Sequence, residues 1–306
     1  MPLFMLRFIR RGLYATLLLL PLALPAFCQV DTLKSAATVE AFVKRYSSYK
    51  AVQVQPLAPA QSVAGSGGMP PGWLVGDVNH DGINDLVVTA LAGESKAGSA
   101  APRLLVLASE KGRYRCVPFE NMFFYSFMAR SAVSARLCAL PAGTYLVVSV
   151  STQPVGRESA GRPVVTHDTV YVRYGRPMLY TAHPQPTKLR QLTFATSGCY
   201  GACPVFELTL SADRTVSYNG LRHVSRLGAH NLLVDQADLY YLNQLLSNLH
   251  LDALRSQYAV PWTDDQTSTL TVTTQQGQTK TIGDYGMKGT FGLAVLYQYL
   301  LGLRNF

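Results

Sequence analysis

Several features that would assign a function at once are missing from this sequence. Beyond its first thirty residues no segment is apolar enough for a membrane-spanning helix, and no tandem repeat is visible. The six histidines are dispersed, and none has a neighbour that suggests a metal ligand or a general base. Gly65-Ser66-Gly67 lacks the spacing of a serine-hydrolase elbow and is typical of a linker. We therefore expect no transmembrane segment in the mature chain and no histidine-centred chemistry.

The first 28 residues have the pattern of a secretory signal peptide. Three arginines precede an apolar stretch over residues 13–24, which is shorter than the ~20 residues of a spanning helix. Ala26-Phe27-Cys28 ends it with small residues where signal peptidase requires them, so we expect cleavage before Gln29. A lipoprotein would be acylated on Cys28, but the bulky Phe27 disfavours that form. The sequence thus predicts an exported protein, either periplasmic or extracellular.

The positive charge of the chain is concentrated in its middle. The formal net charge is +9, and it falls to +6 once the signal is removed. Residues 103–190 hold twelve Lys/Arg against four Asp/Glu. This region could meet an anionic surface or a polysaccharide, but its arginines are scattered singly among residues typical of strands. We favour a solvated face and expect no nucleic-acid partner.

The mature chain of just under 280 residues is long for one domain, so two cores are expected. A mainly-β domain is predicted over 29–184, because short alternating segments follow one another between turns. The boundary lies near Gln185, between two prolines. A smaller domain over 185–306 has the order ββαββα, with strands at 205–210, 215–218, 267–274 and 279–285 and helices at 235–249 and 291–303. The fold class is α+β overall.

A loop rich in oxygen-bearing side chains lies between two predicted strands of the first domain. Its acidic and amide residues occupy positions one, three, five and nine: Asp77, Asn79, Asp81 and Asp85. Calcium takes six to eight oxygen ligands, and this spacing brings side-chain oxygens around one point while Gly82 permits a sharp bend. Ile83, at position seven, would offer its backbone carbonyl.

This loop is not an EF-hand, because position twelve is Val88 rather than a bidentate glutamate and the flanks are not helical in pattern. The alternative is an Asp-, Asn- and Gly-rich turn that simply ends two strands. Three carboxylates within nine residues would then repel one another without any gain. We favour a structural calcium site, since nothing adjacent offers a nucleophile or a base.

The loop followed by Leu86-Val87-Val88 is similar to the calcium motif of FG-GAP and VCBS-type repeats, which occur in integrin-like propellers and secreted bacterial proteins. This resemblance implies that the ligands are Asp77, Asn79, Asp81, Ile83 and Asp85. Because the motif occurs in a single copy, the resemblance implies a solitary calcium-loop domain and not a multi-bladed propeller.

Four cysteines remain after removal of the signal, an even number that suits an oxidising compartment. Cys199 and Cys203 are separated by three residues and run through Pro204 into a strand, unlike a thioredoxin pair. Zinc would usually require a second Cys/His pair at short spacing. A structural disulfide is favoured, while reactive thiols and a metal site remain alternatives. For Cys116 and Cys138 we favour a cross-strand disulfide over buried thiols.

The segment from Cys199 to Pro204 resembles the Cys-aromatic-Gly-x-Cys-Pro start of a domain of unknown function found in exported bacterial proteins. The resemblance extends over residues 189–306 and implies no established chemistry. It leaves open whether Asp264 or Asp265 is the family's aspartate.

Together these features predict an exported, non-enzymatic protein with a calcium-stabilised domain and a disulfide-containing domain that binds an envelope ligand or protein. The alternative is an exported enzyme that uses the Cys199 and Cys203 thiols or a carboxylate of Asp264 or Asp265.

Overall fold

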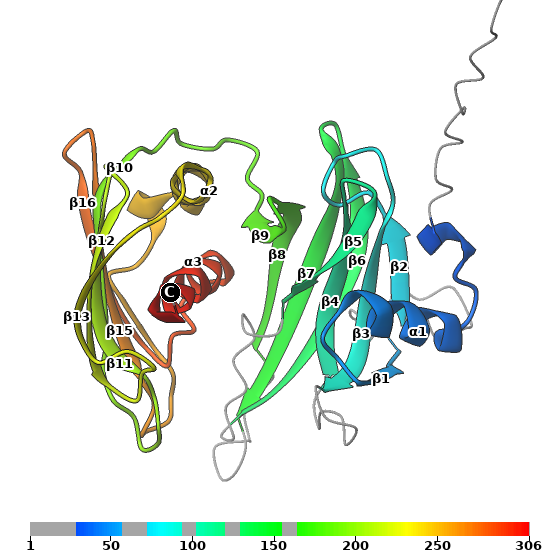
Figure 1. Cartoon of the computed structure of the whole chain (residues 1–306), viewed down its shortest axis with the longest axis horizontal. Helices are drawn as coiled ribbons and strands as arrows, with labels where there is room; N and C mark the ends of the chain where they lie inside the picture. Colours follow the sequence, from blue (N-terminus) through cyan, green and yellow to red (C-terminus); the bar gives the residue numbers. More distant parts are fainter. Residues whose placement is uncertain (1–28, 57–71, 94–101, 120–128, 155–163, 306) are drawn as a thin grey trace, which may run out of the picture.

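The computed structural model describes residues 29–56, 72–93, 102–119, 129–154 and 164–305. The predicted signal peptide, including Cys28, lies outside these residues. The described chain is mostly β, with three α-helices and three sheets, in agreement with the α+β class (Figure 1). None of its described helices combines the length and apolarity that crossing a membrane would require.

The first sheet is five-stranded and antiparallel. β3 (Asp85–Gly93) lies at its centre and pairs with β1 (Ala51–Val54), β2 (Trp73–Gly76) and β4 (Pro102–Glu110). β5 (Arg113–Pro118) follows β4 across a tight turn. The short η1 (Gln29–Thr32) precedes α1 (Ala36–Tyr46), which begins at the Ser35 cap.

Both faces of this first sheet are covered, which explains why β3 is buried along nearly its whole length. Val39, Phe42 and Val43 of α1 pack on the face formed by alternate residues of β3 and β4. The opposite face, which includes Val87 and Val106, packs against the second sheet. The burial pattern follows from period-2 alternation, with apolar residues on both sides of the strand.

The second sheet is a four-stranded meander of long hairpins. It runs β6 (Ala129–Leu140), β7 (Gly143–Pro154), β8 (Val164–Arg173) and β9 (Arg176–Leu179). Its register is regular from one strand to the next.

The third sheet has seven strands in the order β13-β12-β11-β10-β15-β16-β14. The strands are β10 (Leu189–Thr196), β11 (Val205–Ser211), β12 (Thr215–Arg222), β13 (Gly228–Leu233), β14 (Gln257–Ala259), β15 (Thr267–Thr274) and β16 (Thr279–Tyr285). β14 joins the edge in parallel with β16, and the other pairs are antiparallel. Strands β10, β13 and β14 extend the predicted ββαββα order.

Two helices cover one face of this sheet. α2 (Gln236–Leu249) presents its predicted leucine stripe, and α3 (Phe291–Gly302) is buried on almost all sides. The short η3 (Leu251–Ala253) and η4 (Leu303–Asn305) follow them. Phe194 of β10 stacks on Tyr297 of α3, with ring centroids 5.6 Å apart. The two predicted helices are confirmed.

The helices also contact the second sheet, so the two halves of the chain share one core. In Figure 1, α3 lies between the third sheet and the strands β8 and β9. Tyr241 of α2 donates a hydrogen bond to the Pro177 carbonyl at 2.8 Å. Arg176 of β9 forms an ion pair with Asp238 at 2.6 Å. The connection between the halves is therefore held by packing, a hydrogen bond and an ion pair.

Candidate functional site

The calcium-type loop connects β2 to β3 and is closed by its own side chains. Asp77 accepts hydrogen bonds from the backbone N–H groups of Asp81 and Gly82, at 3.2 and 2.9 Å. Asn79 accepts from the Asp81 N–H at 3.1 Å, and Asp81 accepts from the Ile83 N–H at 2.9 Å. Gly82 has φ +85°, which only glycine adopts at low cost. The three side chains thus turn towards the loop interior.

Asp85 has a different position from the other three loop residues. It is fully buried, and its carboxylate accepts from the N–H groups of Val78, Asn79 and Ser109 at 2.8, 3.1 and 2.7 Å. Burial raises the pKa of Asp85 to about 6, although the hydrogen bonds act in the opposite direction. Asp85 therefore fastens the loop to the end of β4.

Ser109 is a partner of the loop that the sequence did not reveal. Its hydroxyl donates to Asp81 at 2.7 Å, and its carbonyl accepts from the Asn79 amide at 2.6 Å. It follows Asp81 by 28 residues and belongs to another strand, so no local pattern could have indicated it.

The oxygen chemistry of the loop can be compared with what calcium requires. Asp77, Asn79 and Asp81 fit in kind, because they offer carboxylate and amide oxygens on one tight loop. Asp85 does not fit as a ligand, since three backbone N–H groups occupy its two oxygens. Among the described residues, no three His, Cys, Asp or Glu side chains are grouped so that they could hold a metal ion.

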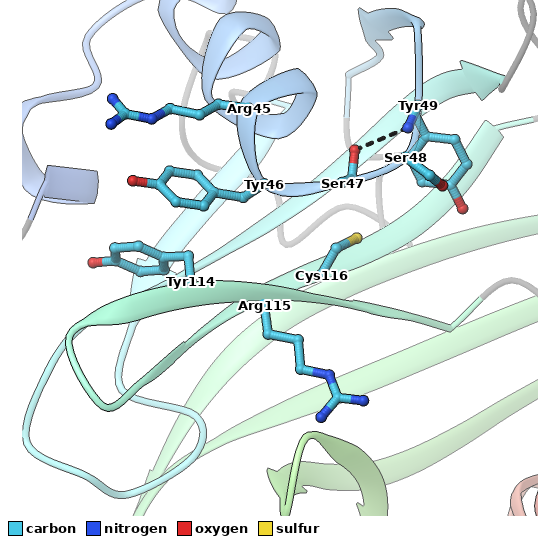
Figure 2. Close-up of a pocket in the computed structure, with 8 residues that line it drawn as sticks. All are labelled: Arg45, Tyr46, Ser47, Ser48, Tyr49, Tyr114, Arg115 and Cys116. Atoms are coloured by element: carbon cyan, nitrogen blue, oxygen red, sulfur yellow. Dashed lines mark hydrogen bonds between the residues drawn. The ribbon is translucent and has the colours of Figure 1, made fainter.

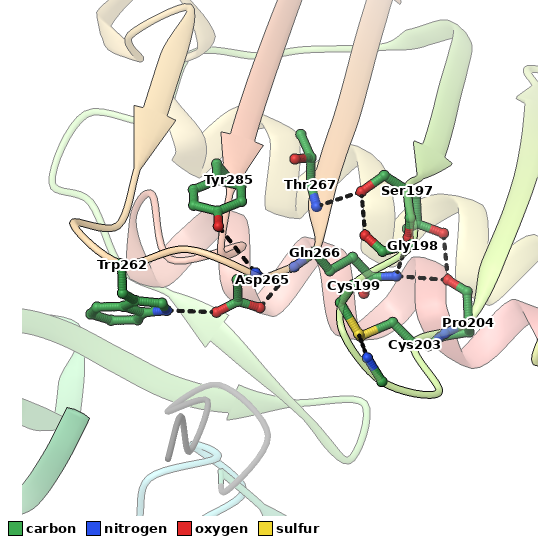
Figure 3. Close-up of a disulfide and its surroundings, with 12 residues drawn as sticks. Ser197, Gly198, Cys199, Cys203, Pro204, Trp262, Asp265, Gln266, Thr267 and Tyr285 are labelled. Atoms are coloured by element: carbon green, nitrogen blue, oxygen red, sulfur yellow. Dashed lines mark hydrogen bonds between the residues drawn. A yellow bond between two sulfur atoms is a disulfide. The ribbon is translucent and has the colours of Figure 1, made fainter. Parts of the chain in front are cut away.

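A second candidate site lies at one end of the third sheet, where a disulfide joins Cys199 to Cys203 with their Cα atoms 5.7 Å apart (Figure 3). The sequence left three possibilities for this cysteine pair: a structural disulfide, reactive thiols or a metal site. The structure contains the disulfide. It closes a five-residue loop between β10 and β11.

The base of the disulfide loop is fixed by a buried glutamine. Gln266 donates from its amide nitrogen to the carbonyls of Ser197 and Pro204, at 2.8 and 2.7 Å. One side chain thereby holds the two stems of the loop. Thr196 also donates to the Pro204 carbonyl at 2.8 Å, and the Thr267 N–H donates to the Ser197 hydroxyl at 2.9 Å. Gln266 lies just before β15, more than sixty residues after the loop, so no local sequence pattern indicates its role.

Tyr200 stands at the tip of this loop with 87% of its surface exposed. Its backbone N–H donates to the Asp264 carbonyl at 3.1 Å, so the tip is fastened to the segment before β15. Asp264 adopts φ +69°, a left-handed conformation that is uncommon for a residue other than glycine. The loop is therefore rigidly attached while its aromatic ring faces solvent.

The two candidate aspartates differ in their surroundings. Asp265 accepts from the Trp262 indole at 2.9 Å and from the Gln266 N–H at 2.8 Å. Its own N–H donates to the Tyr285 hydroxyl at 3.0 Å. Figure 3 shows this chain of contacts beside the disulfide. Asp264 is exposed. The Asp265 carboxylate organises the segment that supports Tyr200.

A partly buried lysine completes this end of the sheet. Burial lowers the pKa of Lys288 to about 8, and the nearby Asp265 charge acts in the opposite direction. The Lys288 ammonium lies 6.0 Å from the Trp262 ring centroid. The fully buried Asp284 accepts from the N–H groups of Lys288 and Gly289, at 3.0 and 2.8 Å, and burial raises the pKa of Asp284. The lysine is thus held by its backbone beside the tryptophan.

The expected disulfide between Cys116 and Cys138 does not form, and both residues are thiols. Cys116 lies on β5 of the first sheet opposite Leu107, whereas Cys138 lies on β6 of the second sheet opposite Tyr145. The prediction failed because it assumed that the two strands were neighbours.

Comparison with known families adds one finding. Residues 190–304 match a family model described as "Domain of unknown function (DUF6438)". The match spans the third sheet and its two helices, including the disulfide loop. No curated protein and no solved structure matches the chain.

Proposed function

We propose that the chain is an exported, non-enzymatic binding protein whose disulfide loop presents Tyr200 to a ligand or protein of the cell envelope. The observation that carries this proposal is the contrast at the loop, where a rigid base supports an aromatic ring that is 87% exposed. Exposed aromatic side chains on fixed supports are frequent binding anchors, because their rings bury much area at little cost in entropy.

Several contacts support a loop that is organised before binding. The disulfide, the Gln266 amide and the Tyr200 N–H each restrict it at a different point. A loop held in this way loses little conformational freedom when a partner binds.

Calcium has a structural role in this proposal. Asp77, Asn79, Asp81 and the Ile83 carbonyl would hold the ion, which would neutralise the two carboxylates and stiffen the connection between β2 and β3. The calcium-type loop lies in the first half of the chain, and the disulfide loop lies in the second half. The ion would stabilise the fold and take no part in ligand binding.

An exported enzyme is the competing proposal. A thiol enzyme requires Cys199 and Cys203 to cycle between disulfide and thiols, and a hydrolase requires an available carboxylate. The Asp265 carboxylate already accepts two hydrogen bonds, which favours a supporting role. Thiol titration of the native mature protein separates the classes. Two reactive groups, from Cys116 and Cys138, agree with binding, whereas a labile Cys199–Cys203 pair agrees with the enzyme.

The binding proposal is tested by sedimentation with isolated bacterial cell envelopes. The Tyr200→Ser variant removes the exposed ring, and Tyr240→Ser is the matched control, because Tyr240 is 45% exposed on α2 away from the loop. We expect Tyr200→Ser to weaken binding by about tenfold, the order of a lost aromatic anchor. Tyr240→Ser should bind like the unchanged protein. Equal binding by both variants, or no binding by the unchanged protein, contradicts the proposal.

A further inference from the structure

A pocket of about 520 Å³ opens between the end of α1 and the strand β5 (Figure 2). Its volume is in the range of small-molecule sites, which is roughly 300–1,000 Å³. Residues 45–49 form one side and residues 114–116 the other. The pocket is remote in sequence from the disulfide loop, so it does not depend on the binding role of Tyr200.

Tyrosine rings form the walls of the pocket. The rings of Tyr46 and Tyr114 have their centroids 5.6 Å apart, and Phe42 meets the edge of Tyr114 at 5.0 Å. Tyr114 also donates to the Asn84 carbonyl at 3.2 Å, which fixes its position. Figure 2 shows Tyr49 on the other side of the pocket, with Cys116 between the walls. The site is thus lined by aromatic rings whose positions are set by packing.

The charge at these walls has one sign. The guanidinium of Arg45 lies 5.3 Å from the Tyr46 ring centroid, and that of Arg103 lies 5.7 Å from the Tyr49 centroid. None of the described residues that line the pocket carries a carboxylate. Of the acids nearby in sequence, Glu40 accepts from the Val54 N–H, and Glu110 lies 3.8 Å from Arg115. The electrostatic character of the pocket therefore favours an anion.

We propose that this pocket binds a saccharide that carries carboxylate groups. The apolar face of a sugar ring would pack on the tyrosines, as amphipathic aromatic rings allow. A carboxylate would pair with Arg45, since charge-assisted hydrogen bonds to guanidinium are strong. The exposed Ser48 hydroxyl can meet the ring hydroxyls. A neutral sugar would not use the arginine, and an acyclic polyanion would not use the rings.

Cys116 provides a reporter for this site. It lies on the same face of β5 as Tyr114, two residues away, and lines the pocket. In a Cys138→Ser protein it is the remaining thiol of the mature chain, because Cys199 and Cys203 are joined. Its rate of alkylation by a maleimide is measured with oligogalacturonate, with the methyl-esterified oligomer and with poly-glutamate. We expect oligogalacturonate alone to slow the reaction.

Two arginine variants make the test specific. Arg45→Gln should weaken the protection by oligogalacturonate by about tenfold, the order of a lost charge-assisted contact. Arg113→Gln is the control, because Arg113 is exposed on β5 and is not one of the residues that line the pocket. Strand alternation places Arg113 on the face of β5 opposite Tyr114 and Cys116. Arg113→Gln should leave the protection unchanged.

Three outcomes overturn the proposal. If oligogalacturonate does not slow alkylation, the pocket does not bind a carboxylated saccharide. If the methyl ester or poly-glutamate protects equally well, the pocket does not recognise a carboxylate together with a ring. Equal loss of protection in the two arginine variants would mean that the effect is general charge attraction rather than contact with Arg45.

Discussion

At the scale of single residues, the end of the third sheet retains groups that reduce stability. Lys288 is partly buried, and burial lowers its pKa to about 8. Asp284 is fully buried, and burial raises its pKa although the N–H groups of Lys288 and Gly289 donate to it. Gln266 is also buried, but its amide donates hydrogen bonds to the carbonyls of Ser197 and Pro204, one on each stem of the disulfide loop. The sequence indicated the cysteines, but it could not indicate Gln266 or Ser109, because each acts on residues far away in the chain.

Replacing Lys288 with methionine should change the pH dependence of stability. The pKa of Lys288 falls from 10.5 to about 8 in the folded protein. Between these values the unfolded chain binds this proton more firmly, so the free energy of unfolding rises with pH in this window. Below about pH 8 the buried charge costs ~3 kcal/mol, which Lys288→Met should recover.

Urea unfolding from about pH 7 to about pH 10 measures this effect. Lys288→Met should be more stable at pH 7 and should lack the rise at higher pH. Lys34→Met, at an exposed lysine, is the control. A Lys288→Met protein that keeps the full rise, or that is less stable at pH 7, would show that burial of Lys288 carries no such cost.

At the scale of elements, the helices α2 and α3 and the hairpin of β15 and β16 followed from the sequence. The leucine spacing of α2 and the alternation of β15 and β16 are each set by one buried face. β13 lies at an edge and is mostly exposed, and β14 has only three residues, so neither has a clear periodic pattern. The predicted disulfide between Cys116 and Cys138 was wrong, because the order of strands in the sequence does not show which strands are neighbours in space.

The prediction at the scale of elements concerns the effect of calcium on the melting temperature through the calcium-type loop. Calcium that binds only the folded state raises the melting temperature, and chelation should lower it by ~5 °C. Asp81→Ala should remove the response, because Asp81 contributes a carboxylate and also bonds Ser109 and Ile83. Glu207→Ala, at an exposed acid on the third sheet, should keep it. Differential scanning calorimetry with and without a chelator makes the comparison, and identical curves would reduce the loop to a strand-ending turn.

At the scale of the whole molecule, the two halves are joined by a continuous core that the predicted domain boundary did not anticipate. α3 packs on both the third sheet and β9, and Arg176 lies against the rings of Tyr241 and Tyr299 at 5.1 and 5.3 Å. The sequence indicated a change of pattern near residue 185. It could not reveal that α2 and α3 would pack on the second sheet as well as on the third. This contact arises from tertiary packing, and the local sequence pattern of one element carries no information about which other element it packs on.

Gly292 marks a close approach of α3 to α2 and β9. A Cβ there would lie 2.5 Å from a Leu249 methyl carbon and 3.0 Å from one of Leu179. Gly292→Ala should lower the free energy of unfolding by ~2 kcal/mol, as overpacking does. Gly302→Ala is the control in the same helix, where a Cβ would meet nothing within 4 Å, and it should be neutral or slightly stabilising. Urea unfolding of both variants gives the comparison, and equal stability of the two would mean that the interface is loosely packed.

The central claim is that the rigid disulfide loop presents Tyr200 to an envelope partner. The most direct measurement is the ratio of the dissociation constants of Tyr200→Ser and Tyr240→Ser on one preparation of cell envelopes. The account predicts that this ratio is about ten, with both variants folded and with the disulfide intact. A ratio near one would contradict it.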